Sequence, residues 1–285
     1  PHGVFLAVDG KRYSVESRRI REILERFTPH LQFVSIDEGY MDVSGTVHLF
    51  GGKRATAEKI QRTVFDETGL TASLGVATCK LVAKIASDLE KPRGLTMVEP
   101  GTEQEFLAPL PVKRLPGVGP KTQQSLAARG VRTIGDLARF SREELKREFG
   151  DYGRDLYRKA RGIDESPVSG GGEAKSIGHE HTFGEDTADL DEIHSVLMHL
   201  CEKTARRMRK AGKKGRTVTT KLRFEDFRTL TRQRTLDEPP VEASELYRIA
   251  LGNLRDLRIG RRKVRLIGVQ VSGFDRPEAA GRQTS

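Results

Sequence analysis

The chain has 285 residues, 36% hydrophobic and 32% charged, a balance typical of globular proteins with sizeable cores. Its 50 Lys and Arg residues against 40 Asp and Glu residues give a net charge of +10, which favours a polyanionic partner, either a nucleic acid or an acidic membrane surface. No apolar run approaches a membrane span, which excludes membrane-embedded classes. Cys79 and Cys201 lie far apart, which argues against a disulfide framework or zinc cluster and favours the cytoplasm.

The first hundred residues alternate between strand-like and helix-like segments. Residues 4–8 have the pattern of a strand, and the apolar residues of 11–27 repeat on one face of a helix. Two short strands follow around an acidic pair, then a helix over 54–68 that Gly69 ends, and a strand over 71–77. This β-α-β-β-α-β order predicts a ferredoxin-like, split βαβ arrangement, a scaffold that implies no chemistry by itself.

The acidic pair between the two short strands consists of Asp37 and Glu38. Neighbours on a straight strand point to opposite faces, so the two carboxylates can share a cation only where the chain bends. Gly39 supplies the freedom to bend there. The pair therefore predicts a metal site, although it also fits a solvated hairpin tip, because acidic residues are common in turns.

A third helix is predicted over residues 79–89, with apolar residues spaced for one buried face. Lys80 and Lys84 lie four residues apart on another side, where their like charges repel modestly. Two interpretations are open at this point: the lysines face water, or they await phosphate groups.

From residue 101 to 162 the sequence becomes helical and polar, with helices predicted over 103–108, 120–128, 133–139, 142–148 and 151–161. Its most specific pattern, residues 115–121, resembles a helix-hairpin-helix, in which glycines let backbone N–H groups approach a phosphate at a helix N-terminus. The pattern predicts contact with a DNA backbone, and a purely structural α-hairpin is the alternative. The residues expected at the backbone are Gly117, Val118, Gly119 and Lys121.

Residues 163–174 have the composition of a linker. The segments beyond it repeat the β-α-β-β-α-β order, with strands over 175–182, 217–224, 229–236 and 264–274 and helices over 190–211 and 242–254. Lys and Arg are concentrated between residues 203 and 234, a stretch with only two acids. Such runs are usually solvated surfaces, but this one spans a helix end, a turn and two strands, which favours a nucleic-acid backbone. The DNA contacts predicted there are Lys213, Lys214, Arg216, Lys221, Arg223, Arg232 and Arg234.

Four of these motifs, in this order, resemble the Y-family (translesion) DNA polymerases of the bacterial DinB, or DNA polymerase IV, type. Residues 35–42 resemble the palm motif of that family, and residues 79–87 together with 91–95 resemble its nucleotide-side helix and loop. Residues 115–119 resemble the thumb hairpin, and residues 175–183 resemble the opening of the little-finger domain.

The resemblance implies a multidomain α+β protein. Its parts are a ferredoxin-like palm over 1–100, an all-α thumb with a helix-hairpin-helix over 101–162, a linker over 163–174, a β-α-β-β-α-β little-finger domain over 175–276, and a tail over 277–285. The family's other metal-binding Asp, its sugar-selecting aromatic residue and its fingers lie upstream of Pro1. We therefore expect a fragment of a longer product, without initiator Met, that carries an incomplete active site.

The activity implied by the resemblance is template-directed addition of deoxynucleotides to a primer 3′-hydroxyl, in translesion synthesis and DNA repair. That chemistry needs two Mg²⁺ ions held by carboxylates, one lowering the pKa of the attacking hydroxyl and both neutralising the transferred phosphate. Asp37 and Glu38 match two of the family's metal ligands. Lys84 matches a lysine that contacts the incoming triphosphate, and Lys80 is expected to assist it.

The partners implied are primer-template DNA and deoxynucleoside triphosphates, bound by a monomer in the cytoplasm without a membrane. A sliding clamp is a further expectation, although no clamp-binding peptide is visible in the sequence. A noncatalytic DNA-binding adaptor of the same family is the alternative, and the retained pair Asp37 and Glu38 argues against it. An accessory module of a helix-hairpin-helix nuclease or ligase would have neither the Lys84 helix nor the second ferredoxin-like domain.

Overall fold

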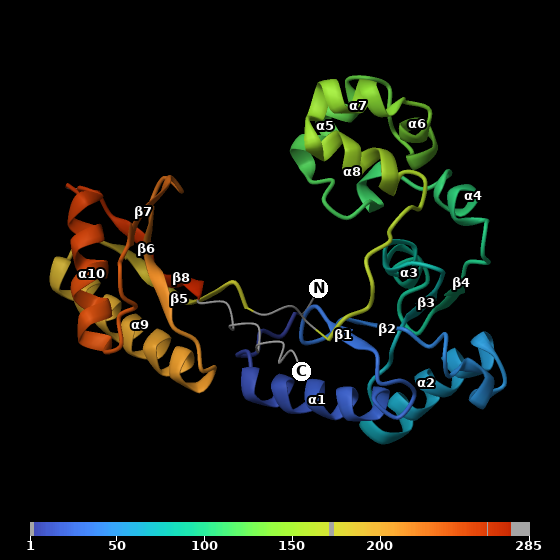
Figure 1. The fold of residues 1–285 in the computed structure, drawn as a ribbon, viewed down its shortest axis with the longest axis horizontal. Coiled ribbons are helices and arrows are strands. Elements are labelled where there is room, and N and C mark those ends of the chain that lie inside the picture. The colour runs from blue at the N-terminus through green and yellow to red at the C-terminus, as the bar shows by residue number, and fades with distance from the viewer. Residues whose placement is uncertain (1–2, 171–173, 261, 275–285) are drawn as a thin grey trace, which may run out of the picture. The chain divides into compact units, whose positions relative to one another are not determined.

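The computed structural model describes residues 3–170, 174–260 and 262–274 of the chain. They belong to two compact units, Pro1–Gly172 and Glu173–Ser285, each of which mixes helices and strands (Figure 1). The predicted α+β class is confirmed. Among the described helices, none combines the length and the apolar character that crossing a bilayer requires. The predicted tail over 277–285 and residues 171–173 of the predicted linker lie outside the described residues.

The first unit begins with two helices that flank a hairpin. Ile23 near the end of the first helix and Phe27 just after it pack with Ile60 and Val64 of the second. The hairpin is antiparallel. The elements are, in chain order, α1 (Gly10–Leu24), β1 (Leu31–Phe33), β2 (Gly39–Met41), η1 (Val47–Phe50) and α2 (Lys53–Thr68).

A tight β-α-β unit follows, made of β3 (Leu74–Val76), α3 (Lys80–Ser87) and β4 (Leu95–Met97). The two strands are parallel, and α3 crosses between them. The apolar face of α3 is buried in one core with the helical part that follows. The predicted helix over 79–89 is therefore present, and its core partners come from the next segment of the chain.

The helical part of the first unit contains α4 (Glu103–Leu107), η2 (Val112–Arg114), α5 (Pro120–Ala127), α6 (Ile134–Ala138), α7 (Arg142–Phe149) and α8 (Asp151–Lys159). Each α-helix lies where the sequence predicts one. Capping boxes start α6, at Thr133 with Asp136, and α7, at Ser141 with Glu144. Leu126 and Leu156, from two of these helices, are fully buried together with residues of α3.

The second unit is a four-stranded antiparallel sheet with the order β5-β8-β6-β7. Helices α9 and α10 cover one of its faces (Figure 1). On β6, Val218, Leu222 and Phe224 are buried beneath the helices, while the alternate residues lie on the other face. The elements are β5 (Ser176–Thr187), α9 (Leu190–Lys210), β6 (Gly215–Phe224), β7 (Thr229–Thr235), α10 (Ala243–Asp256) and β8 (Val264–Phe274).

The strand predicted over residues 4–8 is wrong. The described residues before α1 have no regular secondary structure, and Val4 and Phe5 are 83% and 100% exposed. A strand requires a neighbour for its backbone groups, and among the described strands β1 pairs only with β2 and β3 only with β4. The described part of the first unit consequently contains two separate two-stranded sheets, and the consecutive apolar residues 4–8 have no described sheet to join.

Candidate active site and nucleic-acid interface

The predicted acidic pair lies in the tight connection from β1 to β2. The backbone N–H groups of Val34 and Ser35 both donate to the Glu38 carbonyl, at 3.0 and 3.3 Å, which bends the chain directly before Gly39. Asp37 is exposed, and its Oδ1 accepts a hydrogen bond from the Ser35 hydroxyl. Glu38 is partly buried and reaches helix α3. The bend that the pair requires is therefore present.

Lys84 joins the acidic hairpin to helix α3. Its Nζ lies 2.8 Å from Glu38 Oε2 and 3.2 Å from Asp88 Oδ2. Burial lowers the pKa of Lys84, but its hydrogen bonds to Glu38 and Asp88 outweigh burial and leave the pKa raised. Ion pairs this open to solvent contribute about 1 kcal/mol or less, so the lysine can exchange Glu38 for another anion at low cost.

Lys80 has a different environment from Lys84. Its Nζ donates to Gln32 Oε1 at 3.0 Å and to the Pro167 carbonyl at 2.9 Å. It also lies 5.7 Å from the ring centroid of Tyr40, whose pKa is raised by burial and by the charge of Glu38. The structure thus brings Lys84 to Glu38, leaves Asp37 exposed beside Ser35, and places Lys80 against the chain that leaves α8.

The acidic hairpin offers two carboxylates as candidate metal ligands. Among residues 3–170, 174–260 and 262–274, no three acidic, His or Cys side chains are grouped as a metal shell. Asp37 and Glu38 nevertheless offer hard oxygen donors, and Mg²⁺ is commonly held by one or two carboxylates together with substrate phosphates and water. The Lys84 ammonium on Glu38 shows that this carboxylate accepts a cation. The donor set therefore fits a metal that completes its shell with substrate oxygens.

The predicted hairpin over residues 115–121 is held by its own core and by α8. Val118 is buried, whereas Gly117, Gly119 and Lys121 are exposed. Gly117 has φ 94°, a conformation that favours glycine, and its carbonyl accepts a hydrogen bond from the Tyr152 hydroxyl at 2.8 Å. The hairpin therefore presents glycines and the first turn of α5 to solvent.

The predicted basic residues of the second unit separate onto two faces of its sheet. Arg232 and Arg234 pair across the ladder with Thr220 and Val218, both buried, so they lie on the helix-covered face. There each lies 3.5 Å from Asp256 of α10. Of the others, Lys221 and Arg223 lie on the open face, Lys213 and Lys214 lie in the turn into β6, and Arg216 lies at the start of β6.

Lys221 on the open face already has an acidic neighbour. Its Nζ lies 2.9 Å from Glu180 Oε1 of β5. The two side chains meet over Gly268 of β8, the residue that pairs with both, where a Cβ would lie 2.7 Å from Glu180 Cγ. Glu180 therefore competes with a phosphate for Lys221.

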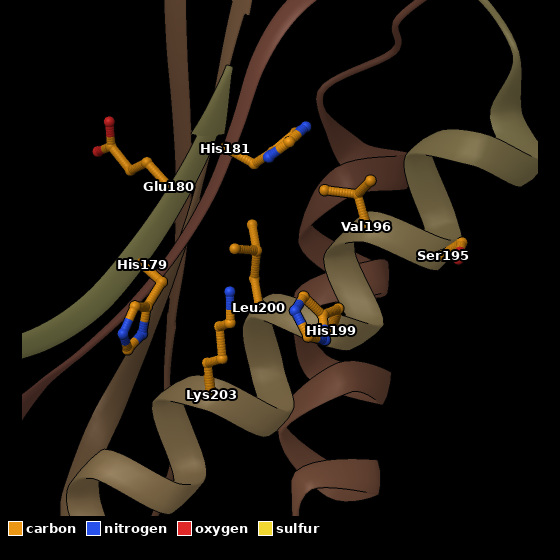
Figure 2. Close-up of a pocket in the computed structure, with 8 residues that line it drawn as sticks. All are labelled: His179, Glu180, His181, Ser195, Val196, His199, Leu200 and Lys203. Carbon is orange, nitrogen blue, oxygen red and sulfur yellow. The ribbon is translucent and has the colours of Figure 1, made fainter. Parts of the chain in front are cut away.

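A hollow of about 290 Å³ lies between β5 and α9 of the second unit. Figure 2 shows three imidazoles around it, from His179, His181 and His199. The Nδ1 of His179 lies 3.1 Å from the Thr204 hydroxyl oxygen, and burial together with the charge of Arg207 lowers the pKa of His179. None of the predicted site residues lines this hollow.

Comparison with known proteins gives the family. Residues 1–88 match the impB/mucB/samB family, residues 113–164 match the thumb domain of DNA polymerase iota, and residues 174–285 match the impB/mucB/samB family C-terminal domain. The DNA polymerase IV of Desulfatibacillum aliphaticivorans is 44% identical over 280 residues, which cover 98% of this chain and 71% of that protein. The chain belongs to the DinB-type Y-family DNA polymerases. The predicted family is confirmed.

Solved structures of Y-family polymerases are similar to this DinB-type chain. A Y-family DNA polymerase chimera of Dbh and Dpo4 is 26% identical with a TM-score of 0.84, and the match covers 95% of this chain and 78% of the chimera. An insertion ternary complex of Dbh DNA polymerase is also 26% identical, with a TM-score of 0.63 and the same coverage. Membership in this family implies a divalent metal cofactor.

Sequence reasoning missed two carboxylates at the site of this DinB-type polymerase. Asp88 binds Lys84, and its i,i+4 spacing from that lysine was a usable signal. Asp164 accepts a hydrogen bond from the backbone N–H of Leu81 at the start of α3. No local pattern predicts this second contact, because the two residues are 83 positions apart.

Proposed function

We propose that Asp37 and Glu38 hold the catalytic Mg²⁺ ions of this protein and that Lys84 binds the triphosphate of the incoming deoxynucleotide. By its family the chain is a DNA-directed DNA polymerase of the translesion type. The 2.8 Å contact between Lys84 and Glu38 carries the proposal, because it puts a phosphate-binding cation beside a metal-binding carboxylate. Lys80 is expected to assist, although its present partners are Gln32 and Pro167.

Two Mg²⁺ ions would supply charge neutralisation on the transferred phosphate and lower the pKa of the primer 3′-hydroxyl. Asp37 and Glu38 would contribute carboxylate ligands to them. Lys84 would leave Glu38 for the phosphates, and Asp88 would keep its ammonium oriented through the 3.2 Å ion pair. The site therefore exchanges one internal ion pair for contacts with metal and nucleotide.

We propose that primer-template DNA is bound by the thumb hairpin and by the basic residues of the second unit. This rests on the proposed division into palm, thumb, linker and little finger at residues 100, 162 and 174. The boundary between the two compact units after Gly172, the thumb model over 113–164 and the C-terminal model over 174–285 support it. DNA as the substrate, and Cys79 and Cys201 as free thiols, favour a cytoplasmic monomer. A sliding clamp is a further expected partner of the family.

A noncatalytic adaptor is the second candidate. Adaptors of this kind lose the metal carboxylates, whereas both carboxylates are present here and one contacts Lys84. This chain therefore fits the enzyme better.

Primer extension by the intact protein tests the proposed catalytic residues. Asp37→Ala or Glu38→Ala should reduce the extension rate by orders of magnitude, because each removes an Mg²⁺ ligand, while the Kd for primer-template DNA stays within about twofold. Asp66→Ala, an exposed carboxylate on α2, is the matched control and should keep full activity. Undiminished extension by either site variant would remove that residue from the metal site.

A further inference from the structure

Helix α3, which carries Lys84, begins without a side-chain cap of its own. Its N-cap residue is Cys79, whose side chain makes no capping hydrogen bond; sulfur is a weak acceptor, and the nearby N–H groups of Val82 and Leu81 only partly offset the rise that burial causes in the pKa of this thiol. Ser, Thr, Asp and Asn are the residues that normally satisfy the free N–H groups at a helix start. The helix therefore needs an acceptor from elsewhere.

Asp164 supplies that acceptor from beyond the end of the helical part. The backbone N–H of Leu81 donates to its Oδ2 at 3.1 Å. The other carboxylate oxygen accepts hydrogen bonds from the Ser166 backbone N–H, at 3.0 Å, and from the Ser166 hydroxyl. Burial raises the pKa of Asp164, but the bonds from Ser166 and Leu81 outweigh it and leave the pKa lowered. An ionised carboxylate at a helix N-terminus also interacts favourably with the helix dipole.

Two further contacts join the same segments. The thiol of Cys79 donates to the Gly162 carbonyl at 3.3 Å, and Lys80 Nζ donates to the Pro167 carbonyl at 2.9 Å. Three consecutive residues at the start of α3 thus bind the chain that leaves α8, which passes α3 in Figure 1. Asp164 is the member of this set that bonds the helix backbone itself.

We propose that Asp164 is a positioning residue for nucleotide binding. Although it lies far from α3 in the sequence, Asp164 caps this helix and so orients it. Lys84 lies on α3 about one turn after Leu81. The cap couples the exit of the helical part to the lysine that reaches Glu38. This inference rests on the proposed role of Lys84 in binding the triphosphate.

Hydrogen exchange in the intact protein, without DNA or nucleotide, tests the cap directly. Asp164→Ala should speed exchange of the α3 amides about fivefold, the effect of losing a typical N-cap when exchange follows local opening. Asp136→Ala is the matched control, because Asp136 bonds the backbone N–H of Thr133 at the start of α6. It should speed exchange at α6 and leave α3 unchanged. Unchanged α3 exchange in Asp164→Ala would overturn the proposal.

A capping side chain at the N-cap position of α3 itself should restore slow exchange in Asp164→Ala. Adding Cys79→Ser to Asp164→Ala places a good N-cap residue at the helix start and should return α3 exchange to within about twofold of wild type. If Asp164→Ala does not fold, Asp164→Asn replaces it, since it keeps an acceptor oxygen and loses only the charge. Its smaller increase in exchange should also be reversed by Cys79→Ser. Failure of rescue in the folded background would contradict a capping role.

Steady-state primer extension links the cap to the nucleotide. Asp164→Ala should raise KM for the deoxynucleotide several-fold with a smaller change in kcat, whereas Asp136→Ala should leave KM unchanged. Lys84→Ala separates the two proposals. If it leaves KM unchanged while Asp164→Ala still loosens α3, the role of Lys84 fails and the cap stands. If it raises KM and Asp164→Ala changes neither KM nor exchange, the cap fails.

Discussion

Gly75 on β3 decides how closely α3 can approach the strand beneath it. A Cβ at this position would lie 2.0 Å from the Ala83 carbonyl oxygen and 2.5 Å from the Ser87 backbone nitrogen. Both atoms belong to the backbone of α3, so only movement of the whole helix could make room. The position of Lys84 therefore depends on a residue with no side chain.

Gly75→Ala should destabilise the first unit by about 3 kcal/mol, because it overpacks a backbone contact that side-chain rotation cannot relieve. Urea unfolding followed by circular dichroism measures the change. Gly45→Ala is the matched control, because a Cβ there meets nothing within 4 Å, and it should be nearly neutral. Equal midpoints for the two variants would show that α3 does not rest on β3 as described.

Helices α6 and α7 begin with capping boxes that depend on ionised carboxylates. Asp136 accepts hydrogen bonds from Thr133 and Arg132, and Glu144 accepts from Ser141. The backbone N–H of Thr133 contributes most to lowering the pKa of Asp136, and that of Ser141 does so for Glu144. Glu144 is exposed and Asp136 is half-buried, so solvent keeps each contribution modest, and together they start two successive helices.

These lowered pKa values predict a loss of helix stability in acid. A carboxylate whose pKa is lower in the folded state stabilises fully above its unfolded pKa, about 4 for Asp and Glu, and this stabilisation is lost as the pH falls through the folded value. Exchange protection at α6 and α7 should therefore decline below about pH 4. The double variant Asp136→Asn, Glu144→Gln should show a flatter profile there. Identical profiles for variant and wild type would contradict the prediction.

The net positive charge of the whole molecule is concentrated in one stretch of the chain. Residues 203–234 carry 13 Lys and Arg residues against two acids, so they account for the net charge of +10 of the whole chain. The sheet nevertheless places these basic residues on both of its faces. Arg232 and Arg234 already bind Asp256, and Lys221 binds Glu180. We therefore expect these basic residues to contribute unequally to phosphate binding, because several of them already have acidic partners.

The logarithm of the affinity for duplex DNA should fall steeply and linearly with the logarithm of the salt concentration, because binding releases counterions from phosphates. Replacing Arg223 on the open face with Ala should reduce the slope by about one unit, independently of DNA sequence. Arg248→Ala on α10, an exposed arginine 3.9 Å from Glu245, is the control and should leave the slope unchanged. Fluorescence anisotropy over a salt series measures both. An affinity insensitive to salt would contradict the electrostatic interface.

The sequence by itself determined the local elements and the chemistry they carry. The strand predicted over 264–274 has the bounds of β8, and the predicted helices of residues 101–162 all form. Helix periodicity, caps and glycine stops are local signals, so the sequence alone is enough to predict the helices that they mark. The acidic pair at 37 and 38 and the helix of Lys84 belong to the same class of prediction. The roles of these residues stay predictions until the variants are measured.

Only the tertiary structure decided which residues meet. Glu38 and Lys84 are 46 positions apart, and Leu81 and Asp164 are 83 apart, so no local pattern could pair them. The same holds for the strand predicted over 4–8, whose run of apolar residues has no described partner strand. It holds again for Arg232 and Arg234, which the register of β7 turns toward α10. Strand pairing and packing between distant segments set these contacts, because backbone groups and ionised side chains require partners that sequence neighbours do not provide.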